Sequence, residues 1–227
     1  MHSETKQPRF QRYLQSKFLY LLASLLLLIA LSSFSVDHKR PNIIGELLFT
    51  AILLSGIWAV SRKKYQTTIA IILALPMLVT LWLTYLVDDK ILTLATDFFS
   101  ISFLLYTMIL ILSFIFKERK VTIDVIFAAI VVYLLIGVMW GFFFSVFEVL
   151  NPGSFSAPNT SPGSYAQGFL YFSFVTLTTL GYGDVTPIGA ATKSFAILEA
   201  VIGQMYIAVL IARLVGMYLV QMTYKKE

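Results

Sequence analysis

The sequence lacks cysteine altogether, contains only two histidines, and has charged side chains at 13% of its 227 positions. Without cysteine, the chain can form neither a disulfide framework nor a thiolate metal site. His2 and His38 both lie outside the apolar segments, and no paired catalytic constellation is evident. We therefore expect that the protein is not an enzyme and that it uses no cofactor.

Hydrophobic residues are abundant where charges are scarce. They make up 58% of the chain and the mean hydropathy is +0.82, whereas soluble domains contain about 45–50% apolar residues. The net charge is +5, but the basic residues form short clusters between apolar runs, which is typical of membrane topology. The composition predicts an integral membrane protein that has lipid as a partner and no nucleic-acid partner.

Apolar runs of about membrane-spanning length recur along the whole chain. A further run at 166–178 is too short to span and is expected to form a re-entrant helix. The longest polar gap, 148–165, is rich in Pro, Gly and Ser and is predicted to be an irregular loop. The predicted fold class is an all-α membrane protein with six transmembrane helices and one re-entrant helix. The six predicted spans are 18–36, 43–60, 67–87, 91–116, 121–147 and 190–220.

The distribution of lysine and arginine predicts the orientation of these helices. With residues 1–17 in the cytoplasm, 13 basic residues lie on the cytoplasmic side and only 4 on the other. Cytoplasmic loops of membrane proteins carry an excess of positive charge. We therefore expect a multi-pass protein of the plasma membrane with both termini cytoplasmic, a short cytoplasmic tail at 221–227, and loop 148–165 outside.

One segment between two long apolar runs carries distinctive chemistry. Residues 176–187 read Thr-Leu-Thr-Thr-Leu-Gly-Tyr-Gly-Asp-Val-Thr-Pro. A dehydrated cation needs rings of oxygen in place of water, and consecutive backbone carbonyls can supply them if they point the same way. Such a backbone alternates between ordinary and left-handed dihedrals, and Gly181 and Gly183 can adopt the latter without a Cβ penalty. The Thr179 hydroxyl would add an oxygen at the inner end.

This segment resembles the selectivity-filter signature of the tetrameric potassium channel family, in its six-transmembrane prokaryotic form. The resemblance covers residues 121–220, which would form the pore domain: outer helix, turret, pore helix, filter and inner helix. It implies K⁺ as the permeant ion and a homotetramer, because one chain supplies a quarter of each oxygen ring. The implied filter residues are Thr179, Leu180, Gly181, Tyr182 and Gly183, with K⁺ held at the first four.

The same resemblance suggests which residues support the filter. Tyr171 and Phe172 stand where many relatives have paired tryptophans, so Tyr171 is expected to hold Asp184 through its hydroxyl. Phe172 has no donor for Tyr182, which leaves Thr176 as the expected partner. Thr178 is a further support candidate, and Val175 replaces a glutamate found behind the filter of some relatives.

The inner helix offers several candidates for gating. Gly203 stands where many relatives bend to open, although glycine in membrane helices also serves close packing. Ile207 and Ile211 are one turn apart and are expected to line an apolar cavity. Glu199 is a carboxylate within an apolar helix: either it is hydrogen-bonded behind the filter, near the pore-helix threonines, or it has a gating or proton-sensing role.

Residues 18–116 are expected to form a four-helix domain that resembles a voltage sensor without gating charges. No Lys or Arg occurs between Ile91 and Phe116, so the fourth helix has no charge to move across the field. Asp97 and Glu46 lie near helix ends and are expected to be solvated or interfacial. The predicted function is a passive potassium-selective channel; the alternatives are a weakly selective monovalent cation channel and a potassium uptake transporter.

Overall fold

The computed structural model describes residues 17–32, 43–60, 63–87, 89–156 and 165–224. Within these ranges the chain is helical and has no β-strand, only an isolated bridge between Phe155 and Pro187. The prediction of an all-α protein is therefore confirmed. The helices are α2 (Lys17–Ser32), α3 (Ile43–Val60), α4 (Lys64–Leu86), α5 (Lys90–Lys117), α6 (Ile123–Leu150), α7 (Tyr165–Leu177) and α8 (Ala190–Tyr224).

Four of these helices, α4, α5, α6 and α8, are long and apolar enough to cross a membrane. Over the part of the chain that the structure describes, α2, α3 and α7 are shorter apolar helices. Within the described residues, four candidate spans are therefore found where the sequence predicted six, since α2 and α3 are among the shorter helices. The predicted termini, residues 1–17 and 221–227, lie mostly outside the described residues, but α8 continues to Tyr224 and so extends the inner helix into the predicted tail.

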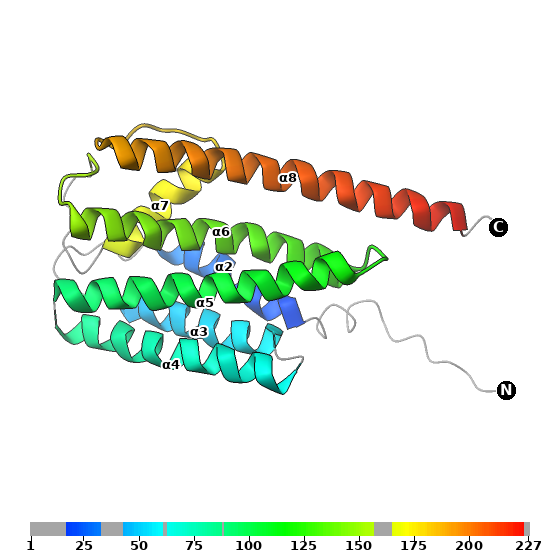
Figure 1. Cartoon of the computed structure of the whole chain (residues 1–227), viewed down its shortest axis with the longest axis horizontal. Coiled ribbons are helices and arrows are strands. Elements are labelled where there is room, and N and C mark those ends of the chain that lie inside the picture. Colours follow the sequence, from blue (N-terminus) through cyan, green and yellow to red (C-terminus); the bar gives the residue numbers. More distant parts are fainter. Residues whose placement is uncertain (1–16, 33–42, 61–62, 88, 157–164, 225–227) are drawn as a thin grey trace.

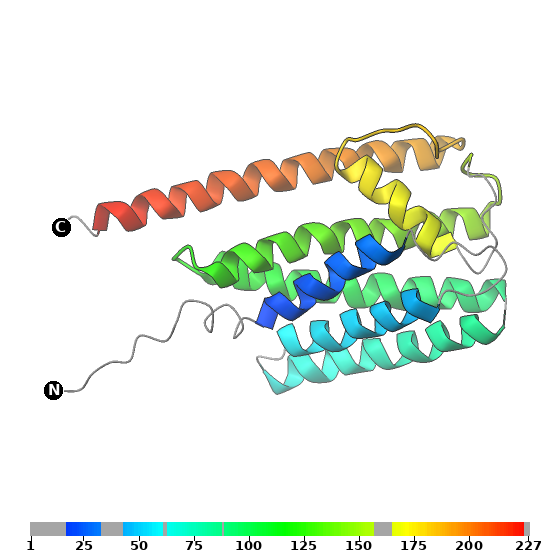
Figure 2. The ribbon, with the colours of Figure 1, turned by 180° about the vertical axis from the view of Figure 1, so that it is seen from behind.

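The helices form two groups that meet at α6 (Figure 1). Helices α2 to α5 form a bundle on one side, with α5 and α2 packed along α6, and α8 lies on the opposite side. Helix α7 crosses obliquely between α8 and the end of α2 (Figure 2). Since α6 has neighbours on both faces, most of its residues are buried, including Val131, Leu135 and Phe144.

Short connections place the basic turns at one end of the bundle. The start of α4 and the link from Lys117 to Thr122 lie at the same end as the last turn of α8 (Figure 1). Thr122 begins α6 by accepting a hydrogen bond from the Val125 amide at 3.4 Å, a side-chain N-cap. Because only five residues separate α5 from α6, the two helices are antiparallel neighbours.

The carboxylate Asp97 is buried, so the expectation that it is solvated or interfacial was wrong. Its side chain is 2% exposed, and its Oδ2 accepts a hydrogen bond of 2.8 Å from the Ser145 hydroxyl of α6. Position near a helix end fixes the depth of a residue along the bundle but not the face it occupies, and Asp97 is on the face of α5 that packs against α6. Glu46 is half-buried, and its Oε2 atom is buried away from solvent.

Candidate functional site

The segment that follows α7 has an alternating backbone. Thr179, Gly181 and Gly183 have φ angles of 60°, 61° and 78°, and the residues between them are not left-handed. The sequence predicted this conformation at the two glycines. At Thr179 it was missed, because a left-handed conformation is uncommon for a residue with a Cβ. This alternation is the backbone pattern expected where consecutive carbonyls must point the same way to replace the water around a cation.

The amide groups of this segment point back to α7. Leu180 and Gly181 both donate to the Val175 carbonyl, at 2.9 and 3.2 Å, and Thr179 donates to Thr176 at 2.9 Å. The carbonyls of residues 179–182 accept no hydrogen bond from any residue that the structure describes. Val175 therefore anchors the segment through its backbone, a role that its side-chain type could not reveal. The segment presents acceptors outward and is exposed, with Tyr182 at 67%.

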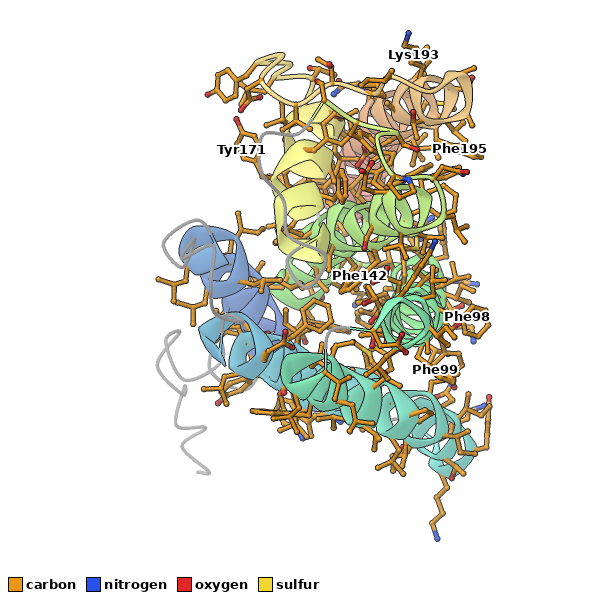
Figure 3. The ribbon with its side chains drawn as sticks, turned by 90° about the vertical axis from the view of Figure 1, so that its left-hand side faces the viewer. Phe98, Phe99, Phe142, Tyr171, Lys193 and Phe195 are labelled. Atoms are coloured by element: carbon orange, nitrogen blue, oxygen red, sulfur yellow. The ribbon has the colours of Figure 1, made fainter. Side chains whose placement is uncertain are left out.

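Tyr171 holds Asp184, as the resemblance suggested. The Tyr171 hydroxyl donates to Oδ2 of Asp184 at 2.7 Å, and this bond lowers the pKa of the Asp184 carboxyl. Tyr171 projects from α7 on the side away from α6 (Figure 3). The contact joins α7 to the residue that follows the alternating segment.

The other support candidates make contacts elsewhere. Phe172 is buried against Phe144 and Phe155, with ring centroids 5.0 and 5.2 Å apart. The Thr178 hydroxyl donates to the Phe174 carbonyl at 2.6 Å within α7. Thr176 contributes its carbonyl to Thr179, and among the described residues no hydrogen bond joins it to Tyr182. Phe172 thus packs α7 against α6 and the loop that follows α6.

Hydrogen bonds join the loop after α6 to the chain that follows the alternating segment. The sequence did not predict this connection. Glu148 at the end of α6 accepts from the amides of Gly153 and Phe155 at 2.7 and 3.2 Å. Ile188, beyond the segment, donates to the Ser154 carbonyl at 2.8 Å. Residues 151–156 of the loop predicted to be irregular are therefore ordered by a carboxylate; its residues 157–164 lie outside the described part.

Three glycines allow α7 to lie close to its neighbours. A Cβ at Gly203 of α8 would be 2.6 Å from the Leu177 carbonyl, and one at Gly141 of α6 would be 3.1 Å from Leu170 Cα. A Cβ at Gly137, one turn before Gly141, would be 2.7 Å from the Phe174 ring. Gly137 and Gly141 form a Gly-x-x-x-Gly motif, a sequence signal for close helix packing that was overlooked.

The remaining inner-helix candidates lie on both faces of α8. Ile207 is half-buried and Ile211 is 55% exposed. Glu199 is fully buried and its Oε1 lies within hydrogen-bond distance of the Ser173 hydroxyl. Its partner is thus a pore-helix serine, one turn before the expected threonines. Phe195 of α8 packs between α8 and α6, 5.0 Å from the Phe143 ring (Figure 3).

The fold and the site together define a helical membrane protein in which a short helix and the alternating segment after it lie between two long helices in the sequence. Comparison with known proteins agrees with this class. The profile of a family described as "Ion channel" matches residues 121–220, the residues predicted for the pore domain. No solved structure matches the chain significantly.

Three relatives illustrate the matches. Two-pore potassium channel 2 of Arabidopsis thaliana is 34% identical over 101 residues, which are 44% of this chain and 20% of the relative. Protein LctB of Bacillus caldotenax is 31% identical over 101 residues, 43% of this chain and 75% of that protein. Inward rectifier potassium channel Kirbac3.1 of Paramagnetospirillum magnetotacticum is 41% identical over 51 residues, 22% of this chain and 17% of the relative.

The chain belongs to the ion channel family, whose members are channels and not enzymes. It spans only about a fifth of the length of the two-pore channels that it matches.

Proposed function

We propose that the protein is a passive potassium-selective channel. The observation that carries this proposal is the alternation of left-handed residues at Thr179, Gly181 and Gly183, in a segment whose carbonyls accept no hydrogen bond from the described residues. Stripped of water, K⁺ is stabilised by such carbonyl oxygens. Relatives named as potassium channels match 101 and 51 residues of the chain. K⁺ would bind at Thr179, Leu180, Gly181 and Tyr182, and Gly183 would complete the filter.

We infer that four copies of the chain surround the ion path. Each chain has one candidate filter, and four are needed to close each ring of oxygens. In one subunit, Leu180 is 54% exposed and Tyr182 67% exposed, and α8 presents apolar side chains such as Met205 and Val209. Association of four subunits would cover the filter and part of α8, while lipid would cover the outer faces.

We further infer six spans, with α2 and α3 crossing the plasma membrane alongside the four longer helices. Both termini would be cytoplasmic, since the turns with most of the basic residues lie at the end of the bundle opposite to the candidate filter. The domain at 18–116 would flank its own pore domain through α5 and α2. Since α5 has no Lys or Arg between Ile91 and Phe116, opening would not depend steeply on voltage.

Ile207 and Ile211 would line the cavity below the filter. For Gly203, the contact with the Leu177 carbonyl favours close packing of α8 against α7. Helix α8 is also continuous through this glycine. Bending at Gly203 would require α8 to move away from α7.

The decisive experiment is the reversal potential of the purified, reconstituted protein in asymmetric K⁺ and Na⁺. We expect it to follow the K⁺ gradient. Equal permeability would favour the weakly selective cation channel, and flux without passive current would favour an uptake transporter. Mass measurement in nanodiscs tests the assembly: a functional monomer or dimer would contradict the tetramer.

A further inference from the structure

A buried carboxyl group meets a buried serine where α6, α7 and α8 converge. Glu199 of α8 and Ser173 of α7 are both 0% exposed. The Ser173 Oγ lies 2.7 Å from the carbonyl oxygen of Gly137 in α6 and within hydrogen-bond distance of Glu199 Oε1. One serine oxygen therefore has contacts with both helices that hold α7.

Counting hydrogens at Ser173 determines the state of Glu199. A serine hydroxyl has one proton to donate and lone pairs to accept. The Gly137 oxygen is a carbonyl and can only accept, so the bond at 2.7 Å uses the serine proton. The contact between Ser173 Oγ and Glu199 Oε1 then needs a proton on Oε1. A carboxylic acid supplies that proton, and a carboxylate does not.

The other oxygen of Glu199 leads to the same conclusion. Its Oε2 is buried and accepts no hydrogen bond from the part of the chain that the structure describes. An ionised oxygen without a donor is costly in a low-dielectric interior, and a neutral carbonyl oxygen far less so. Glu148 provides the contrast, because both of its oxygens accept from backbone amides, which suits a carboxylate.

Ser173 is close in sequence to the anchor of the candidate filter. It lies half a turn before Val175, whose carbonyl holds the Leu180 and Gly181 amides. A shift of α7 at Ser173 would therefore reach the filter through Val175. Without the Glu199 proton, the single hydroxyl proton of Ser173 could be donated to only one of its two neighbours, the Gly137 carbonyl or the Glu199 carboxylate. Helix α7 would then lose its hydrogen bond to either α8 or α6.

We propose that Glu199 is a positioning residue: as an uncharged acid it donates to Ser173, and the resulting chain of hydrogen bonds holds the pore helix and filter in their selective arrangement. This inference deepens the proposed potassium channel and rests on it. At alkaline pH, transfer of the Glu199 proton to bulk base would reduce the K⁺ selectivity of the channel.

Among the described residues, the titratable groups nearest to Glu199 are engaged in other hydrogen bonds. On α6, Tyr133 is within electrostatic range, and its hydroxyl donates to Leu177 O at 3.4 Å. Helix α7 has no charged residue, and its Tyr171 is bonded to Asp184. On α8, the Tyr206 hydroxyl donates to Ala129 O at 2.8 Å. The charged residues of α8 are Lys193 and Arg213, more than one helical turn from Glu199.

The first test is infrared difference spectroscopy of the full-length protein in lipid, which needs no channel activity. The wild type should show the carbonyl stretch of a protonated carboxylic acid, and Glu199→Gln should lack that signal. Glu148→Gln is the matched control and should retain it. A spectrum in which Glu199→Gln removes no protonated-acid signal overturns the proposal, whether or not the protein conducts.

The second test compares pH profiles. The Gln side chain can donate to Ser173 at every pH, so Glu199→Gln should keep K⁺ selectivity and lose the alkaline decline of the wild type. Glu199→Leu keeps similar volume without a donor and should weaken selectivity at all pH values, because one buried hydrogen bond is lost in each subunit. Identical pH profiles of wild type and Glu199→Gln would overturn the positioning role.

A third measurement separates this inference from the channel proposal. Thermal stability of the wild type should fall on alkalinisation more than that of Glu199→Gln, because the variant lacks the Glu199 acid that must lose its proton and shares all other buried acids with the wild type. If K⁺ current is absent but this difference and the infrared signal are present, the channel proposal fails and the assignment of Glu199 as a donor stands. Equal loss of stability in both proteins overturns that assignment.

Discussion

Substitution of Gly203 by alanine tests how closely the inner helix must approach the pore helix. The added Cβ would lie 2.6 Å from Leu177 O, whereas real Cβ contacts essentially never fall under 3.0 Å, so the backbones must separate by at least about 0.4 Å. Overpacking of this kind costs about 1–3 kcal/mol. We expect Gly203→Ala to lower the free energy of unfolding by that amount per subunit and to impair K⁺ selectivity, since Leu177 is two residues before Thr179.

Gly216→Ala is a matched control on the same helix. A Cβ at Gly216 meets nothing within 4 Å, and alanine is the better helix former by about 1 kcal/mol. This variant should be as stable as the wild type or more stable. Both variants can be compared by denaturant titration in micelles with circular dichroism, and by reversal potential after reconstitution.

A second variant distinguishes a backbone clash from a side-chain clash. Leu177→Ala removes the side-chain atoms near Gly203 but leaves the carbonyl oxygen at 2.6 Å, so it should not rescue Gly203→Ala. At Gly137 the neighbour is the end of the Phe174 side chain, and there Phe174→Leu should rescue Gly137→Ala. If Gly203→Ala is as stable as Gly216→Ala, the reasoning about close packing at Gly203 is refuted.

The remaining predictions concern the candidate filter, the voltage response, the contact of Arg213 with α5 and the Tyr171–Asp184 bond. Gly181→Ala should abolish K⁺ current. Gly153→Ala is the control, because Gly153 is also a positive-φ glycine with open space around it; this variant should carry the same strain of about 1–2 kcal/mol and still conduct. Equal currents in the two variants would contradict the filter assignment. Open probability measured by patch clamp should vary only weakly with voltage, and a curve that moves several gating charges would refute this. Arg213 donates to Ile115 O and Phe116 O at the end of α5, at 2.9 and 3.1 Å, so Arg213→Gln should reduce unfolding free energy by about 1.5 kcal/mol in a denaturant titration, and no change would count against this cap. Tyr171 lowers the pKa of Asp184 from its ordinary 3.8, so the contribution of their bond to stability is present above that pH and is lost as the pH falls through the lowered pKa. The free energies of unfolding of wild type and Tyr171→Phe should therefore differ at neutral pH and converge in acid. A difference that stays constant with pH would show that the bond does not depend on ionised Asp184.

The sequence alone was sufficient for the class of fold and for the location of the candidate filter. A long apolar run can be hidden from water only as a membrane or core helix, so the length of the run gives the length of the helix. For α5 the predicted span was 91–116, and the observed helix, Lys90–Lys117, is one residue longer at each end. The glycines at 181 and 183 identified left-handed positions because few other residues adopt them readily. The Tyr171–Asp184 contact was expected only through resemblance to a family.

Only the tertiary structure decided which residues meet across helices. Asp97 and Ser145 are far apart in sequence, and nothing in α5 alone indicates that Asp97 faces α6. The same holds for Ser173, which contacts Gly137 and Glu199 on two different helices. Periodicity reports the hydrophobicity of a helix face, whereas a helix that is apolar all round, such as α6, gives no such signal. Hydrogen-bond partners and close approaches depend on helix rotation and crossing, which the packing of all the helices sets together.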